Sequence, residues 1–316
     1  MVLLLVIVVE VLIFNAIGRR FLTADNVANI VRQSVEIGLL ALVMTPVILT
    51  GGIDLSVGSL LGLCAVTFGM LWGELHWPPW LAALGAVGVG ALGGCVNAAL
   101  ITSLRLPALI VTLGTFSLFR GIAEALTGGT IAYTKFPASF LALGNSFFLG
   151  VPVQAWVFFV VAVAVWLLVH RTTAGRAFRA IGFAPEGARY AGLPVGRRVA
   201  LAYILAGSVA GVAAVIFVSR VTEARANAGV GYELAAITAV VLGGTSIFGG
   251  RGSVHGTLLG VAAVAVLGNG LSRILSITAV SRELAGILTG ALLLVALAAG
   301  ALTTRWRGAG DRGPSA

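Results

Sequence analysis

Charged residues are scarce in this sequence. Only 10% of the 316 residues are charged, against about 25% in a typical soluble domain. Hydrophobic residues make up 59% of the chain, and the mean hydropathy is +1.07. So few charges cannot give every helix a polar face, which excludes an ordinary soluble domain. Because long apolar runs recur from end to end, the sequence predicts an all-α polytopic membrane protein.

Cysteine, histidine and lysine are also nearly missing, and each shortage excludes a kind of chemistry. Cys64 and Cys95 stand in no metal or redox spacing and are expected to be small core residues. The three histidines form no zinc motif, and Ser253 beside His255 has no third group to complete a catalytic set. The only lysine is Lys135, so the phosphate-binding motif G-x-x-x-x-G-K-[ST] is missing. We expect no catalytic residues, no metal and no cofactor, with any ATP bound by a partner subunit.

The basic residues are almost all arginine: 19 of the 20, in a chain of net charge +9. In a soluble protein this charge would suggest nucleic acid. Here the arginines lie in short stretches between apolar segments, where they set orientation and contact anionic headgroups. The expected partner is therefore the lipid membrane, and nucleic acid is not expected.

Ten apolar segments are predicted to span the membrane. The first, MVLLLVIVVEVLIFNAIG, lacks the basic start and the cleavage site of a signal peptide and is interpreted as a span. Two pairs of short segments are interrupted by glycine, which makes up 43 residues of the chain. The ten segments are 2–17, 35–50, 57–72, 80–103, 107–127, 151–169, 199–219, 233–248, 253–271 and 284–303.

The connection 170–198 determines the predicted orientation. It holds six arginines against one acid, Glu186, and is cytoplasmic by the positive-inside rule. With ten spans, both termini are then cytoplasmic, including the arginine-rich tail 304–316. The whole chain, 1–316, is interpreted as one transmembrane domain.

A weak internal repeat places a helix break in each half of the chain. TPVILTGGIDLSVGSLLGL (45–63) resembles TAVVLGGTSIFGGRGSVHGTLLGV (238–261). Paired, glycine-interrupted apolar segments are typical of a transporter whose substrate pathway lies at a repeat interface. The alternative is that the glycines only allow close helix packing.

The most conspicuous polar residue is Asp54, which follows the first glycine pair, because an acid within the membrane is costly. Either Asp54 or Ser56 caps the next helix, or Asp54 lines the pathway or contacts the cytoplasmic face. The residues assigned to the substrate pathway are Gly51, Gly52, Asp54, Ser56, Asn97, Thr112, Thr115, Phe116, Thr245 and Ser246.

Arg120 and Glu124 stand four residues apart and are predicted to form an ion pair on one helix face. Phe116 and Phe119 beside them either stack on a sugar ring or face lipid, and the lipid-facing interpretation is preferred. Asp54 and Glu124 are taken as the only strong candidates for a buried ion or proton site.

The loop after His170 contains a predicted short helix with Pro185 in its first turn and Glu186 behind it. Gly192 and Pro194 are expected to stop this helix. Its small residues Gly187 and Ala188, with the aromatic Tyr190, either form a knob for a partner's groove or belong to a solvated loop.

Three stretches carry a resemblance to a known family: ILTGGIDLSVGSLLGL, AIGFAPEGARYAGLPVGRRVALAYILAGSVAGVAAV and AITAVVLGGTSIFGGRGSVHGTLLG. They resemble, in order, the permease subunits of ribose-type ABC importers, and the resemblance extends from about residue 25 to 300. Members of this family transport monosaccharides such as ribose and rhamnose, and the furanose-like signal autoinducer-2.

The resemblance implies an inner-membrane pathway formed by two permease subunits, identical or related. A periplasmic sugar-binding protein would deliver the solute, and a cytoplasmic ABC ATPase would drive transport. The loop matching Gly182 to Gly192 would couple the chain to that ATPase, through Gly182, Pro185, Glu186, Gly187, Ala188, Tyr190 and Gly192. Relatives often carry Gly-Gly-Asn before the glutamate, where this chain has Phe183, Ala184 and Pro185.

Two other classes of function are weighed against this one. A secondary transporter would need no ATPase but usually keeps a buried ion site, for which the sequence offers only Asp54 and Glu124. An intramembrane enzyme would need a catalytic set, which the sequence does not supply.

Overall fold

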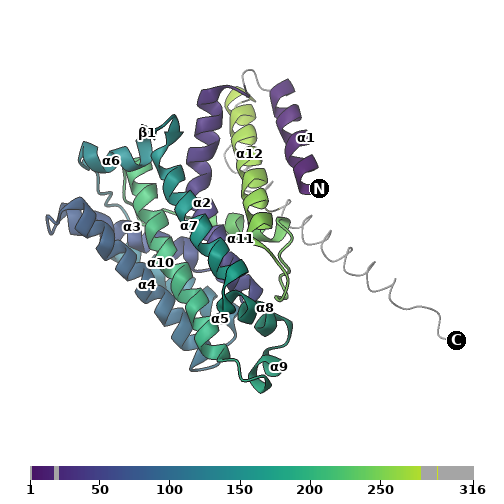
Figure 1. Cartoon of the computed structure of the whole chain (residues 1–316). Coiled ribbons are helices and arrows are strands. Elements are labelled where there is room, and N and C mark those ends of the chain that lie inside the picture. The colour runs from purple at the N-terminus through teal and green to yellow at the C-terminus, as the bar shows by residue number, and fades with distance from the viewer. Residues whose placement is uncertain (1, 18–20, 279–289, 291–316) are drawn as a thin grey trace.

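The computed structural model describes residues 2–17, 21–278 and 290. This part of the chain forms a helical bundle with one short hairpin of two strands, each two residues long (Figure 1). The elements are α1 (Val2–Ile17), α2 (Ala24–Leu49), α3 (Val57–Gly73), α4 (Pro79–Thr102), α5 (Ala108–Thr127), α6 (Ala138–Asn145), β1 (Phe147–Phe148), β2 (Val151–Pro152), α7 (Val153–Arg171), α8 (Thr173–Phe183), α9 (Pro185–Tyr190), α10 (Val195–Val221), α11 (Tyr232–Leu242) and α12 (Val254–Thr278).

Six of the described helices are long and apolar enough to cross a membrane, judged by length and composition: α2, α4, α5, α7, α10 and α12. Helices α1, α3 and α11 are shorter and also apolar. Nine predicted segments coincide with these nine helices, while the segment 284–303 and the tail 304–316 lie outside the described residues. The all-α polytopic class is confirmed.

Three helix boundaries differ by more than five residues from those predicted, and one of them is the end of α12, which lies at Thr278 rather than at 271. Helix α2 begins at Ala24 rather than at 35, because Thr23 accepts a hydrogen bond from the Asn26 amide (3.4 Å) and Asp25 lies in the first turn. Its polar first turns hide it from a search for apolar runs. Helix α11 ends at Leu242 rather than at 248, because Gly244 takes a left-handed backbone with φ of +86°.

Helix α10 forms the centre of the bundle and packs against α2, α3 and α4. It runs antiparallel to α4 and approaches it backbone to backbone. A Cβ placed on Gly90 would lie 2.3 Å from the Gly207 carbonyl oxygen, and one on Gly94 would lie 2.5 Å from that of Tyr203. Only glycine allows two helices to approach this closely, as at many membrane helix interfaces.

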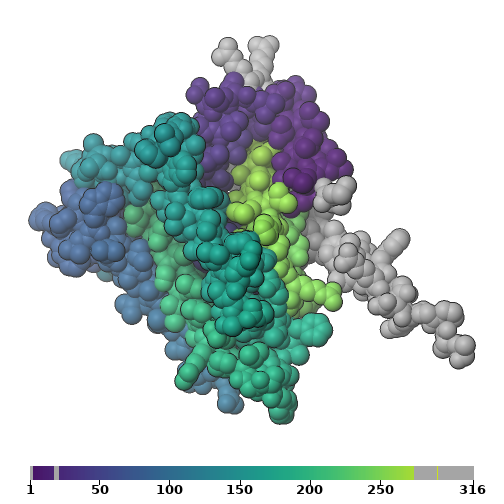
Figure 2. Space-filling model, in the orientation of Figure 1, coloured from purple at the N-terminus to yellow at the C-terminus, as the bar shows by residue number. Residues whose placement is uncertain are grey.

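The molecule has two distinct ends (Figure 1). One carries α8 and α9 and is called the α8–α9 end; the other carries α6 and the hairpin and is called the α6 end. Helix α7 runs between the two ends across the front of the molecule, with α4 to its left and α12 to its right (Figure 1, Figure 2).

Both predicted helix breaks exist, and both lie toward the α8–α9 end. Residues 50–56 separate α2 from α3, and residues 243–253 separate α11 from α12. The two halves of the repeat also meet, because the hydroxyls of Thr45 and Thr257 are 2.7 Å apart. This contact between the start of one repeat and the end of the other joins α2 to α12.

Candidate functional site

A buried chain of hydrogen bonds crosses three segments at the first helix break. The Asp54 carboxylate accepts from the Ser56 amide (2.8 Å) and hydroxyl (2.6 Å). The Asn97 side-chain amide of α4 donates to the Ser56 hydroxyl (2.8 Å), and the Thr115 hydroxyl of α5 donates to the Asn97 oxygen (2.7 Å). Thr112 donates to the Ile53 carbonyl at 3.1 Å. We call Asp54, Ser56, Asn97, Thr112 and Thr115 the Asp54 network.

The Asp54 network unites five of the ten residues assigned to the pathway, but it corrects the expected cap. Ser56 is the N-cap residue of α3 by position, yet its side chain makes no capping bond. Asp54 accepts from Ser56 itself, one residue before the helix, so it orders the break rather than the first turn of α3. Asp54 is 1% exposed, and its surroundings are neutral hydroxyl and amide groups.

The glycines before Asp54 serve two different purposes. Gly51 has φ of +82°, the left-handed backbone that ends α2. Gly52 leaves room for a side chain, because a Cβ there would lie 2.4 Å from the Tyr203 hydroxyl oxygen. That hydroxyl is buried and has no hydrogen-bond partner among the described residues. The sequence contained no signal for the role of Tyr203.

A cavity of about 260 Å³ lies next to this break at the α8–α9 end. Gly51, Gly52 and Tyr203 line one part of it, and Arg105 and Arg189 line another. This cavity, which has basic groups in its wall, therefore connects the first break to the α8–α9 end.

The remaining pathway candidates lie elsewhere. Thr245 and Ser246 form the turn of the second break, where the Ser246 amide donates to the Arg251 carbonyl (2.9 Å). Phe116 is partly exposed on α5. Its neighbour Phe119 is 4% exposed and packs beside Gly93 of α4. The lipid-facing interpretation is thus wrong for Phe119.

The predicted Arg120–Glu124 ion pair is absent from the described part of the chain. Arg120 instead donates to the carbonyls of Ala226 and Ala228, the second at 3.1 Å. The guanidinium reaches across to the segment before α11 because several backbone acceptors converge there, which one helix face cannot supply.

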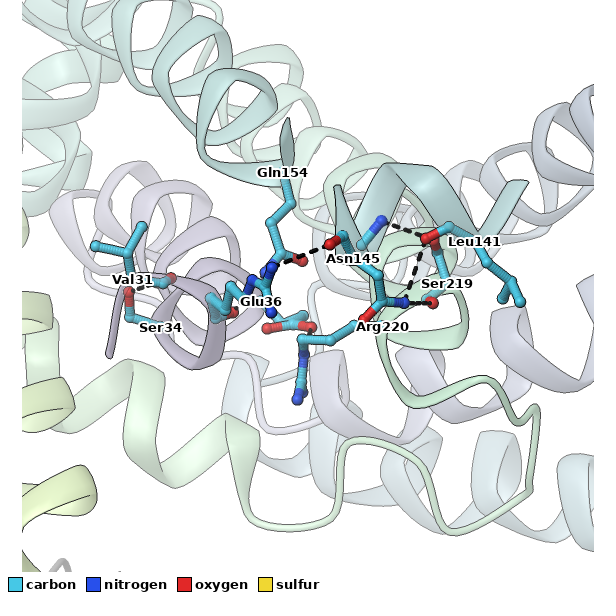
Figure 3. A network of polar contacts seen from close by, with 10 residues as sticks. Val31, Ser34, Glu36, Leu141, Asn145, Gln154, Ser219 and Arg220 are labelled. Atoms are coloured by element: carbon cyan, nitrogen blue, oxygen red, sulfur yellow. Dashed lines mark hydrogen bonds and ion pairs between the residues drawn. The ribbon is translucent and has the colours of Figure 1, made fainter. Parts of the chain in front are cut away.

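A second buried polar group was missed by the sequence reasoning. Glu36 of α2 is fully buried and accepts from the Arg220 guanidinium of α10 at 2.6 Å. Figure 3 shows the two side chains meeting between their helices. The choice of Asp54 and Glu124 as the only strong acids was therefore wrong.

Several side chains at the α6 end extend this ion pair into a network (Figure 3). Ser219 donates to the Phe140 carbonyl (2.8 Å) and accepts from the Gly144 amide (2.8 Å), while Asn145 donates to the Ser219 carbonyl (2.8 Å). Gln154 donates to the Arg32 carbonyl at 3.0 Å. We call Glu36, Arg220, Ser219, Asn145 and Gln154 the Glu36 network. It holds α2, α6, α7 and α10 together.

A signal for the Glu36 network was present in the sequence. Glu36 and Arg220 stand at the edges of two apolar segments, and alternating topology brings those two edges to one side of the membrane.

In the loop before α6, Tyr133 donates a hydrogen bond to Glu74. Burial and this hydrogen bond raise the pKa of Tyr133 to about 12.

The predicted short helix exists as α9, with Pro185 at its first position and Gly192 left-handed (φ +77°) after its end. Tyr190 is 91% exposed and Phe183 of α8 is 75% exposed. Glu186 pairs with Arg189 at 2.8 Å on the surface.

One member of the expected knob points inward. Ala188 is 4% exposed and packs in a small core with Ala177, Ile181 and Val195, because α9 needs an apolar residue to attach it to α8 and α10.

One smaller expectation is corrected as well. Cys64 is buried, but Cys95 is exposed on α4 and is not a core residue. His170 and His255 are distant in sequence, yet their ring centroids are 5.2 Å apart. The His170 ring accepts from the Val254 amide (3.2 Å) at the start of α12. No group of three or more metal-ligand residues occurs among the described residues.

Comparison with known proteins agrees with this architecture. Residues 26–297 match the family described as the branched-chain amino acid transport system / permease component. The chain belongs to this family. It is 39% identical over 294 residues to the autoinducer 2 import system permease protein LsrD of Escherichia coli strain K12, covering 92% of this chain and 88% of the relative. The same identity and coverage hold for the LsrD proteins of Shigella flexneri and Escherichia coli O157:H7.

These findings confirm the ABC importer permease expected from the sequence. The chain is a multi-pass inner-membrane transport subunit and not an enzyme. The interpretations as a secondary transporter or an intramembrane enzyme are thereby set aside.

Proposed function

We propose that this permease moves a monosaccharide-sized, neutral polar solute, and that autoinducer-2 is the first candidate. The named relatives import autoinducer-2 and are similar over 92% of this chain, which is the observation that supports the proposal. The Asp54 network fits such a solute, because its hydroxyl and amide groups can exchange hydrogen bonds with sugar hydroxyls once the break opens. Other sugars of the same size, ribose or rhamnose, are the alternatives.

The proposed assembly has three kinds of component. A periplasmic binding protein delivers the solute, two permease subunits enclose the pathway, and a cytoplasmic ATPase binds and hydrolyses ATP. The α8–α9 end faces the cytoplasm, because the segment 170–198 carries six arginines and one acid. The α6 end then faces the periplasm, and both termini are cytoplasmic.

The solute is tested with the complete transporter in proteoliposomes, together with its periplasmic binding protein. We expect ATP-dependent uptake of autoinducer-2 to exceed uptake of ribose and rhamnose at equal concentration by at least tenfold. The control omits ATP. Uptake of ribose or rhamnose with no uptake of autoinducer-2 would contradict autoinducer-2 as the solute and leave the assignment as an importer intact.

The docking surface proposed for the ATPase consists of α9 and the end of α8. Exposed aromatic side chains are frequent anchors in interfaces, and Tyr190 and Phe183 project from this end with no role in the internal core. Gly187 offers a clean test, since a Cβ there would meet only the Ala184 Cβ at 3.5 Å. A larger side chain at Gly187 therefore changes the surface without disturbing the fold.

We expect Gly187→Trp and Tyr190→Ala each to weaken association with the ATPase by at least tenfold while the permease inserts normally. Association is measured by co-purification at graded ATPase concentration. Phe148→Ala is the matched control, because Phe148 is 60% exposed at the opposite end. Normal association in both α9 variants would contradict the docking assignment.

A further inference from the structure

Three backbone segments meet at one point near the α8–α9 end. The Gly250 amide of the second break donates to the Leu49 carbonyl at the end of α2 (3.0 Å). Gly182, in the last turn of α8, lies against the same two residues. A Cβ on Gly182 would be 1.9 Å from the Leu49 oxygen and 2.4 Å from the Gly250 nitrogen. We call Gly51, Gly182, Gly249 and Gly250 the glycine junction.

Gly249 of the second break also lies directly against Gly51 of the first break. A Cβ on Gly249 would lie 2.8 Å from the Gly51 nitrogen and 2.9 Å from the Gly182 Cα. Gly51 and Gly249 both have positive φ, +82° and +85°. The contacts thus join backbone to backbone, with no flexible side chain between them to absorb a displacement.

Helix α8 is also packed tightly against α9, which forms most of the proposed docking surface. Ala184 is the only residue between α8 and α9. The small core of Ala177, Ile181, Ala188 and Val195 packs α8, α9 and the start of α10 together. Helices α8 and α9 should therefore move together, so that a displacement of α9 also displaces Gly182.

We infer that Gly182 is a positioning residue for transport, through which the glycine junction carries motion of α8–α9 to both helix breaks at once. This inference rests on the proposed function, because the force originates at the docked ATPase. It also changes the role given to Gly182, which touches the end of α2 and the second break rather than serving as an ATPase contact. Coupling through contiguous packed elements of this kind is physically expected, and the shared contact makes the two breaks move together.

The junction offers two matched pairs of variants. Gly182→Ala is compared with Gly196→Ala, since both glycines are helical and the Gly196 Cβ would meet only Thr102 at 3.8 Å. Gly249→Ala is compared with Gly244→Ala, since both have nearly equal positive φ (+85° and +86°) and a Cβ on Gly244 meets nothing within 4 Å. Each pair shares its backbone cost and differs only in the contact at the junction.

The readout is solute uptake per ATP hydrolysed by the assembled transporter. We expect Gly182→Ala and Gly249→Ala to lower this ratio at least tenfold, while ATP hydrolysis stimulated by the binding protein stays within twofold. The controls keep the ratio of the parent protein. A merely structural role would lower uptake and hydrolysis together and leave the ratio unchanged, which would overturn the inference.

A second measurement needs no variant and decides the question if the junction variants fail to assemble. Hydrogen–deuterium exchange of the complete transporter is compared with and without ATP plus orthovanadate. We expect peptides covering 180–191, 49–53 and 247–252 to change together. A change confined to 180–191 would overturn the inference and leave the docking surface intact. No change at 180–191 would instead contradict the docking surface and, with it, the inference.

Discussion

The Asp54 network and the Glu36 network both bury an acid inside the helical bundle, and they stabilise it differently. Asp54 is surrounded by hydroxyl and amide groups, from Ser56 next to it in sequence to Asn97 and Thr115 on α4 and α5. Glu36 is paired with the cation Arg220, which is 184 residues away. Hydroxyl and amide groups can exchange their hydrogen bonds with a polar solute, whereas a buried ion pair resists separation. The comparison places the adaptable site at the helix break and the rigid one at the α6 end.

The largest expected effect comes from breaking the buried ion pair. Glu36→Ala leaves the Arg220 guanidinium without its partner and should lower the free energy of unfolding by about 3–5 kcal/mol. The measurement is unfolding by a denaturing detergent in mixed micelles. Glu36→Gln keeps an acceptor oxygen and should cost less.

The control is Glu223→Ala, which breaks the exposed Arg225–Glu223 pair, whose side chains are 51% and 29% exposed. It should change the free energy of unfolding by about 1 kcal/mol or less. Equal costs for Glu36→Ala and Glu223→Ala would remove the contrast between the networks.

A medium effect is expected at the first break. Asp54→Ala removes the acceptor for two hydrogen bonds of Ser56 and should cost about 1–3 kcal/mol in the same unfolding measurement. Asp54→Asn retains one acceptor oxygen and should lose less. A double-mutant cycle with Asn97→Ala should show coupling between the two positions, because both bind the Ser56 hydroxyl. Strict additivity would show that Asp54 and Asn97 act separately.

The smallest effect is expected at the far end of the Asp54 network. Thr115→Val removes the donor to Asn97 and should cost about 0.6 kcal/mol, the average for a hydrogen bond between membrane helices. Thr67→Val is the control, since the Thr67 hydroxyl donates only to the Leu63 carbonyl of its own helix (2.9 Å). A cost for Thr115→Val no larger than for Thr67→Val would separate Thr115 from the network.

Sequence reasoning found the first network and missed the second for a physical reason. Asp54 interrupts an apolar run beside two glycines, so local composition alone marks it. Glu36 stands where polar residues of α2 give way to apolar ones, and its cost is offset by Arg220 from another part of the chain. Arg120 was noticed but given the wrong partner, because proximity along a helix was preferred to acceptors 106 residues away.

The composition by itself determined the membrane class, and the apolar runs located nine described helices within a few residues, apart from the three corrected boundaries. The glycine pairs determined that two helices break, because no other residue takes those backbone angles without strain. Only the tertiary structure decided that Gly182 touches both the end of α2 and the second break, and that Glu36 meets Arg220. Those contacts join segments far apart in the chain, and no local pattern encodes the distance between two backbones.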